Sequence, residues 1–131
     1  MISIVDVETS YQPTKHGGKD PLPFNPKNIL VSVGINDEYY FTNHTQRVDE
    51  GCYYKIQAVL DKTTLLVGHN IKFDLEWLLE AGFKYEGKVY DTMLGEYILN
   101  RGIRKSLTLD MCCKRRNLGE KSKLIQEEMD L

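Results

Sequence analysis

The sequence predicts an α/β domain in which helices flank a mixed β-sheet. Apolar runs rich in β-branched residues occur at residues 1–9, 29–35 and 65–70, which is typical of strands. From residue 73 onward the apolar positions recur with helical spacing. The predicted strands alternate with helices at first, and only helices follow after residue 73. In a chain of 131 residues this order indicates one α/β unit spanning residues 1–131.

The first half of the chain is mainly extended. Residues 1–9 form the first strand, and an unusually long loop, residues 10–28, holds all four prolines. Residues 29–35 and 38–44 form two strands of a hairpin, because an Asn-Asp pair between β-prone runs is a strong short-range turn signal.

Helical signals alternate with one more strand in the middle of the chain. Residues 51–64 form a helix whose apolar stripe consists of Tyr53, Ile56, Val59 and Leu60. Residues 65–70 form a short buried strand. Residues 73–83 form a helix with Phe73, Trp77, Leu78 and Ala81 on one face and Gly82 as the residue that ends it.

Two further helices are expected toward the C-terminus. Asp91 lies at a natural N-cap position before the apolar run of residues 91–100. The last helix opens at Ser106 and closes near Gly119.

Composition excludes several classes of protein. A formal net charge of −2 argues against nonspecific binding of polyanions, so nucleic-acid contacts must be local. The three cysteines show no C-x-x-C spacing, and we expect reduced thiols in a cytosolic protein rather than a zinc site. No apolar run approaches the roughly 20 residues of a membrane helix, and no export signal precedes the first strand.

The stretch "IVDVETS", residues 4–10, places two acids in an apolar strand. Side chains alternate along a strand, so Asp6 and Glu8 point the same way, about 7 Å apart. Asp74 lies in a first helical turn, beyond the carboxyl end of a strand that can lie beside the first. Three carboxylates around one cleft suit Mg²⁺ or Mn²⁺ better than zinc.

Each of these residues also has a purely structural interpretation, which the sequence leaves open. Acids are common at the solvated ends of strands, and the helix dipole favours an acid at Asp74. His69 and Asn70 are explained as turn and capping residues, and Asp91 is assigned to capping.

The order of these segments resembles a known family. "DVETS", "GHNIKFDLEWLLEAGF", "YDTMLGEYILN" and "SLTLDM" are similar in wording and spacing to the proofreading 3′–5′ exonuclease domain of family A DNA polymerases. The D-x-E-T stretch resembles the first motif of the DEDD exonuclease superfamily, and Asn70-x-x-x-Asp74 resembles the second. The "DTML" segment is typical of the polymerase-linked branch.

The resemblance implies a ribonuclease H-like fold and two-metal hydrolysis of single-stranded DNA 3′ ends during DNA replication. Asp6 would bridge two Mg²⁺ or Mn²⁺ ions, Glu8 would bind the ion that activates water, and Asp74 would support the second. The substrate-binding residues implied by the resemblance are Thr9, Asn70 and Phe73, and the expected partner is a polymerase domain.

Basic residues are concentrated near the C-terminus. Residues 101–123 contain eight lysines and arginines against two acids, Asp110 and Glu120. A solvated helix face explains them, and a surface that follows phosphates or docks another domain is the alternative.

One part of the family pattern is absent from this sequence. The third motif, Tyr-x-x-x-Asp or His-x-x-x-x-Asp, does not occur downstream of Asp74. We therefore expect that the C-terminal part of the fold is missing, whether it was removed, is supplied by another chain or has been lost. The chain starts directly at its first strand, like compact phage-type enzymes, which suggests a viral protein in the cytoplasm of a bacterial host.

Three functions remain open from the sequence. The first is an enzyme, the metal-binding portion of a proofreading exonuclease with weak activity or none by itself. The second is a noncatalytic module that binds DNA or docks a polymerase. The third is an RNA-trimming exonuclease of the same superfamily. Clustered acids favour the enzyme, because a noncatalytic scaffold does not require several carboxylates at one place.

Overall fold

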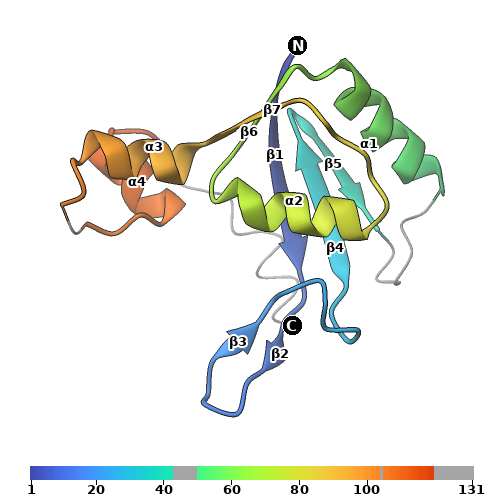
Figure 1. Ribbon diagram of the computed structural model, residues 1–131, viewed down its shortest axis with the longest axis horizontal. Coiled ribbons are helices and arrows are strands. Elements are labelled where there is room, and N and C mark those ends of the chain that lie inside the picture. Colours follow the sequence, from blue (N-terminus) through green and yellow to red (C-terminus); the bar gives the residue numbers. More distant parts are fainter. Residues whose placement is uncertain (43–49, 104, 120–131) are drawn as a thin grey trace.

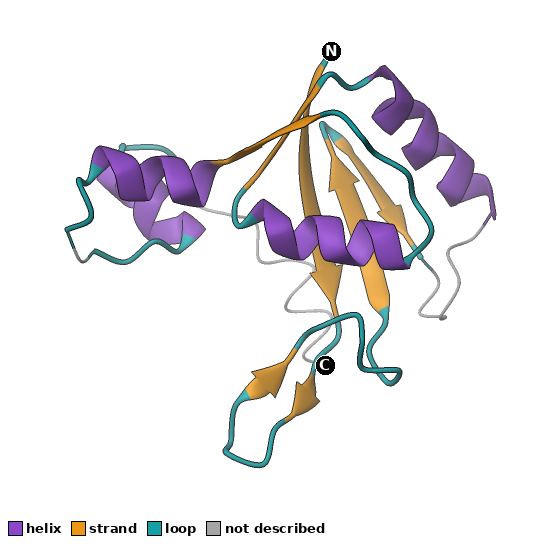
Figure 2. Cartoon of the chain, in the orientation of Figure 1, coloured by secondary structure: helices purple, strands orange, loops and turns teal. Residues whose placement is uncertain are grey.

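The computed structural model describes residues 1–42, 50–103 and 105–119. Within them the chain forms one five-stranded sheet, a two-stranded ribbon and four helices (Figures 1 and 2). The strands are β1 (Ile2–Thr9), β2 (Gln12–Pro13), β3 (Lys19–Asp20), β4 (Leu30–Ile35), β5 (Glu38–Phe41), β6 (Leu65–Gly68) and β7 (Lys88–Asp91). The helices are α1 (Glu50–Lys62), α2 (Ile71–Glu80), α3 (Thr92–Leu99) and α4 (Leu109–Arg115).

The main sheet is mixed, with the strand order β5-β4-β1-β6-β7. β4 is antiparallel to both β1 and β5, whereas β1, β6 and β7 run parallel. The pairing of β6 with β1 stops at Val67 opposite Ile4, so among the described residues the second half of β1 has a strand partner only on its β4 side. The predicted α/β class with a mixed sheet flanked by helices is confirmed.

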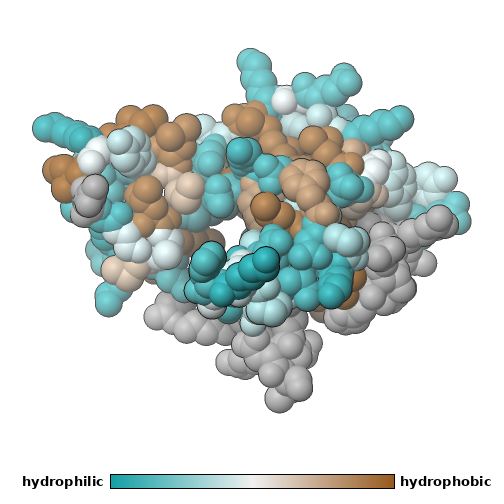
Figure 3. Space-filling view, turned by 60° about the horizontal axis from the view of Figure 1, so that its bottom comes forward, coloured by the Kyte–Doolittle hydropathy of each residue, from teal (hydrophilic) through white to brown (hydrophobic). Residues whose placement is uncertain are grey.

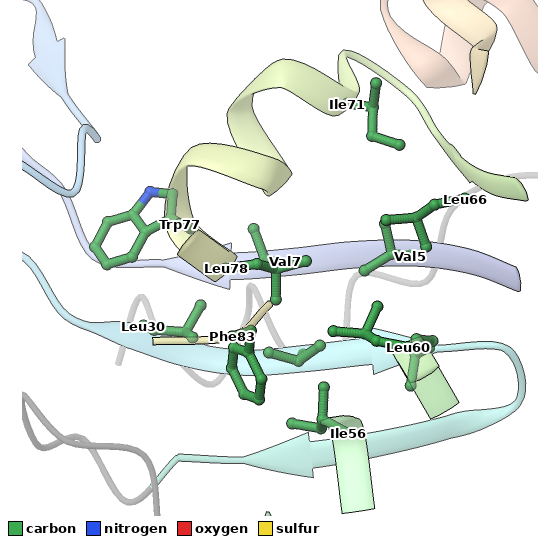
Figure 4. Close-up of a cluster of buried hydrophobic side chains, with 12 residues drawn as sticks. Val5, Val7, Leu30, Ile56, Leu60, Leu66, Ile71, Trp77, Leu78 and Phe83 are labelled. Atoms are coloured by element: carbon green, nitrogen blue, oxygen red, sulfur yellow. The ribbon is translucent and has the colours of Figure 1, made fainter. Parts of the chain in front are cut away.

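The core lies on one face of this sheet, which we call the inner face. Val5 and Val7 of β1 point into it and are 2% and 5% exposed. Ile56 and Leu60 of α1 and Ile71 and Leu78 of α2 pack against them, together with other buried side chains (Figure 4). Burial of each such side chain contributes about 1.5–3 kcal/mol. Helices α1 and α2 are therefore fixed relative to β1.

The opposite face, the outer face, carries the alternate side chains of each strand. Ile2 and Ile4 are exposed there, and Asp6 and Glu8 follow them along β1 as half-buried side chains. Tyr39 and Phe41 of β5, which pair with Gly34 and Ser32, are also more than half exposed. The two acids thus lie on the face of the sheet that α1 and α2 leave uncovered.

Most predicted helix signals are confirmed by the structure. The expected stripe on α1 faces the core, with Ile56 and Leu60 buried. Gly82 adopts φ 95°, a left-handed conformation that favours glycine, directly after α2. Asp91 caps α3 by accepting a hydrogen bond from the Met93 N–H. Helix α2 begins at Ile71, slightly before the predicted start.

Three elements differ from the sequence-based expectation. β7 was missed, because its four residues, of which Lys88, Val89 and Tyr90 are exposed, give no strand pattern. The last helix begins at Leu109, not Ser106, since Thr108 accepts from the Met111 N–H and caps it, and α4 ends at Arg115 well before Gly119. The predicted loop 10–28 contains the β2–β3 ribbon. Of the predicted strand 38–44, residues 43 and 44 lie outside the described residues.

Cys112 is buried, Cys52 and Cys113 are half-buried, and none of the three forms a disulfide in the described structure. Among the described residues, no helix combines the length and apolar character needed to cross a lipid bilayer.

Candidate active site

Asp6 and Glu8 are held on the outer face by the alternation of β1. Their neighbours Val5 and Val7 are buried in the core, which fixes the direction of the two carboxylates. Asp6 lies opposite Gly34 of β4, and a Cβ at Gly34 would lie 2.8 Å from the Tyr39 ring atom Cε1. The absence of a side chain at Gly34 therefore lets the Tyr39 ring lie against the strand next to Asp6.

The pairing of β1 with β4 becomes irregular directly after the acid pair. Glu8 lies opposite Ser32, whereas Thr9 lies opposite Leu30, so one residue of β4 is skipped. Bulges of this kind re-aim side chains and are frequent beside active sites. Thr9, predicted to contact substrate, is half-buried at this irregularity and ends β1.

Asp74 is a buried residue of helix α2 that contacts strand β1. Its side chain is 3% exposed, and its Oδ1 accepts a hydrogen bond of 3.0 Å from the Val7 backbone N–H. The amides of Ile4 and Ser10 face β4, so the amide of Val7 faces the β6 side, where none of the described strands pairs with it. The structure thus brings Asp74 to the residue between Asp6 and Glu8.

The start of α2 is fixed by an aspartate of a different element. The Asn70 N–H donates to Asp91 Oδ1 at 2.8 Å, and the same oxygen accepts from the Met93 N–H at 2.9 Å. One carboxylate therefore joins the first turns of α2 and α3. Sequence reasoning found the cap of α3 but missed the bond to Asn70. The Asn70 side chain makes no capping bond, and its backbone is left-handed at φ 58°.

His69 connects the same turn to the C-terminal helices. Its Nε2 lies 2.5 Å from the Leu107 carbonyl oxygen, and its Nδ1 lies 2.9 Å from Thr92 Oγ1. A carbonyl oxygen only accepts, so Nε2 carries a proton and donates it. These contacts agree with the structural role expected for His69.

A cleft of about 530 Å³ lies between the outer face and the region of α4. Asp6 lies on its wall, together with apolar side chains of the sheet and of the C-terminal region. The lining residues also include Ile4, Tyr39, Val67, His69, Leu109 and Leu118. Neither Glu8 nor Asp74 lines this cleft. Its wall is mostly apolar and carries one carboxylate, that of Asp6.

The donor chemistry of the site suits a hard cation. Carboxylate and hydroxyl oxygens are the ligands that Mg²⁺ and Mn²⁺ prefer. Ser32, opposite Glu8 on the same face, is 0% exposed, and its hydroxyl has no hydrogen-bond partner in the described part of the chain. Within the same residues, no group of three His, Cys, Asp or Glu side chains is arranged to hold a metal ion. Convergence of the three acids on a metal therefore stays a prediction.

Phe73 is partly buried and packs against the core cluster. This contact gives Phe73 a role in the core, and its role in wedging bases stays a prediction.

Two arginines of the basic segment 101–123, Arg115 and Arg116, form ion pairs within the protein. Glu96 of α3 is 7% exposed and accepts from Arg115 Nε at 3.2 Å and from Arg116 Nη2 at 3.3 Å. Burial acts to raise the pKa of Glu96, but the hydrogen bonds and charges of Arg115 and Arg116 outweigh it and hold that pKa below its usual value. These two arginines join α3 to α4. Arg104, Lys121 and Lys123 lie outside the described residues.

Comparison with known proteins identifies the family. No curated protein matches the chain. A family model described as 3′–5′ exonuclease, for the exonuclease domain of family A DNA polymerases, matches residues 16–126. The match begins after Asp6, Glu8 and Thr9 and includes Asn70, Phe73 and Asp74. Because it covers most of the chain, this protein belongs to the 3′–5′ exonuclease family found in family A DNA polymerases.

Proposed function

We propose that this chain is the metal-binding portion of a proofreading exonuclease that shortens single-stranded DNA from its 3′ end. Family membership supports the reaction class. The observation that carries the site is the hydrogen bond from the Val7 N–H to Asp74, which links the acid pair to the family-matched helix α2. The proposed partners are the DNA 3′ end and a polymerase domain, and the proposed location is the cytoplasm.

The proposed metal ligands are Asp6, Glu8 and Asp74, which would hold two Mg²⁺ or Mn²⁺ ions. Bound ions of this kind lower the pKa of a water molecule and stabilise a departing oxygen. In the proposed reaction, water forms a bond to the terminal phosphorus while the bond from phosphorus to the 3′ oxygen breaks. The products are a nucleoside 5′-monophosphate and a strand with a new 3′ hydroxyl.

The protein's own contribution is to orient the proposed ligands Asp6, Glu8 and Asp74. The Val7 amide orients one oxygen of Asp74, and the strand alternation orients Asp6 and Glu8. Thr9 and Asn70 are proposed to hold the strand near the acids. The cleft beside Asp6 is proposed to receive the terminal base, because its apolar wall can contact a base without reading its identity.

Downstream of Asp74 the sequence has no third-motif tyrosine or histidine followed by an aspartate at the family spacing. A fourth carboxylate and the group that positions water would then come from a further segment, in the same polypeptide or in another one. We propose that the 131-residue chain by itself is a poor nuclease.

A noncatalytic module is the second candidate, favoured by one observation. No three potential ligands are arranged to hold a metal among the described residues. Such a module would bind DNA or dock a polymerase without cleaving. An RNA-trimming exonuclease differs from the main proposal in substrate alone.

A single-turnover assay with excess protein and Mn²⁺ tests the proposed function. One single-stranded DNA carries a label at its 5′ end, and a second carries it on its 3′ nucleotide. We expect slow shortening of the first and direct release of a labelled mononucleotide from the second, both lost in Asp6→Ala. Cleavage from the 5′ end, or equal cleavage by Asp6→Ala, would overturn the proposal. Faster cleavage of the matching RNA would favour the RNA-trimming alternative.

A further inference from the structure

The β2–β3 ribbon projects from the molecule at the end of β1 where the acid pair lies (Figure 1). Gln12 pairs with Asp20 and Pro13 with Lys19, and the intervening residues form the tip. We call residues 11–28 the projecting hairpin. Figure 3, which brings this end of the molecule forward, shows hydrophilic surface there, beside hydrophobic patches elsewhere.

The base of the projecting hairpin is fastened to the body of the protein. Within the hairpin, Asn28 is 6% exposed and closes the base, because its Nδ2 donates to the carbonyl oxygens of Asp20 at 2.8 Å and Leu22 at 2.9 Å. Trp77 of α2 donates from Nε1 to the Pro21 carbonyl oxygen at 2.9 Å. Trp77 lies one turn after Asp74 on the same helix, so one helix fixes both the hairpin and the third acid of the site.

The tip is closed by its own hydrogen bonds. The Thr14 N–H donates to the Gly18 carbonyl at 3.0 Å, and the Gly18 N–H donates to Thr14 Oγ1 at 2.9 Å. Because hydrogen bonds hold both its base and its tip, the hairpin loses little conformational entropy when its side chains bind a partner.

The charge of the projecting hairpin is opposite to that of the whole protein. Its basic residues are Lys15, Lys19 and Lys27, and its one acid is Asp20. The Asp20 carboxylate accepts from the Leu22 N–H and from Asn25 Nδ2, both at 3.2 Å, so it is directed inward. In a chain of net charge −2, this is a local positive surface.

Two aromatic side chains accompany these lysines. Phe24 is 67% exposed and Tyr11 is 41% exposed. Lys19 Nζ lies 4.3 Å from the centre of the Tyr11 ring, which places a cation beside an aromatic face. Exposed aromatic rings interleaved with lysines are the combination that binds single-stranded nucleic acid, because rings stack on bases and lysines contact phosphates.

We propose that the projecting hairpin binds the single-stranded DNA several nucleotides before its 3′ end, through Lys15 and Lys19 on phosphates and Tyr11 and Phe24 on bases. This inference rests on the proposed function, since it takes the 3′ end to lie at Asp6 and Glu8. The tip lies up to roughly 30 Å of extended backbone beyond Glu8. Stacked phosphates are about 3.4 Å apart, so about nine nucleotides reach it and three do not.

Equilibrium binding of two oligonucleotides, of three and twelve nucleotides, tests the proposal. The proteins are wild type, the hairpin variant Lys15→Gln at the tip, and the matched control Lys55→Gln, which removes one exposed lysine from α1. The twelve-nucleotide strand is titrated at several salt concentrations by fluorescence anisotropy. The trinucleotide is measured by calorimetry.

We expect the hairpin variant to bind the longer strand roughly threefold more weakly at low salt. The slope of log K against log salt should fall by about 0.7, which corresponds to one phosphate contact on a single strand. Trinucleotide binding should be unchanged, and the control variant should match wild type.

Equal affinity and equal salt slope of the hairpin variant and wild type for the longer strand would overturn the hairpin proposal alone. Loss of trinucleotide binding in the hairpin variant would also overturn it, because the contact would then lie at the 3′ end. If wild type binds neither oligonucleotide, the proposed function itself fails, and this inference falls with it.

Discussion

The Val7 backbone N–H donates a hydrogen bond to Asp74 Oδ1, across 67 residues of sequence. Val7 stands between Asp6 and Glu8, so the bond brings an acid of α2 to the strand that carries the other two. The bond forms because β6 leaves β1 after Ile4, and α2 takes its place beside the strand. The gap in the sheet thus lets an acid of α2 contact the strand that carries Asp6 and Glu8.

The first prediction concerns stability. Asp74→Ala leaves the buried Val7 N–H without its acceptor and should lower the free energy of unfolding by about 1–3 kcal/mol. Asp74→Asn keeps a carbonyl oxygen that can accept from the same amide, so it should lose less. Urea denaturation of the three proteins measures this order. Equal destabilisation by the two substitutions would show that the hydrogen bond to Val7 is not what Asp74 contributes.

The second prediction concerns pH. Because Arg115 and Arg116 hold the pKa of Glu96 below its unfolded value, ionised Glu96 stabilises the fold above about pH 4.3, its usual value. That contribution is lost as the pH falls through the lowered pKa of the folded state. Wild type should therefore exceed Glu96→Gln in melting temperature at pH 7, and the difference should shrink on acidification. Glu80→Gln, at an exposed position on α2, is the control and should show no such trend.

Much of the fold could be predicted because its signals are local. The alternation of β1 predicted the shared face of Asp6 and Glu8, and the apolar run after Asp91 predicted the capped helix α3. Strand β7, which the sequence did not predict, shows the limit of such local signals. Val89 and Tyr90 are exposed, and their pairing with β6 depends on a neighbour distant in sequence. Propensity alone does not encode such a partner.

The sequence proposes the residues of the candidate site but does not predict the contacts between them. Nothing local in the sequence indicates that Asp74 accepts from Val7, or that Asp91 holds Asn70 as well as its own helix. The irregular pairing after Glu8 likewise depends on the register between two strands. Tertiary packing decides all three.

The third prediction concerns substrate choice. Affinity that arises from stacking and a few phosphate contacts should give weak, salt-sensitive binding to short single-stranded DNA and little binding to blunt duplex. Fluorescence anisotropy with labelled single strands, duplexes and RNA compares them directly. Tighter binding to duplex DNA, or to RNA through its 2′ hydroxyls, would assign the chain to another branch of its family.

The fourth prediction concerns catalytic power. Catalytic groups that act as a unit fail together, so a chain without the third-motif residues should cleave several orders of magnitude more slowly than a complete site. Turnover of a labelled single strand with Mg²⁺ measures the deficit. A downstream segment that carries Tyr-x-x-x-Asp, added in the same chain or as a separate polypeptide, should restore cleavage. Robust digestion by the 131-residue chain alone, abolished by Asp6→Ala, would instead direct attention to Asp91 or Asp110 as a fourth acid in the described structure, or to Glu128 outside it.

The fifth prediction concerns the metal site itself, and Mn²⁺ binding tests it most directly. Titration calorimetry compares wild type with Asp6→Ala, Asp74→Asn and the control Glu80→Gln. We expect wild type and the control to bind Mn²⁺ alike, Asp6→Ala to bind it most weakly, because Asp6 is proposed to touch both ions, and Asp74→Asn to lie between. Equal Mn²⁺ affinity in wild type and Asp6→Ala would contradict the proposed site.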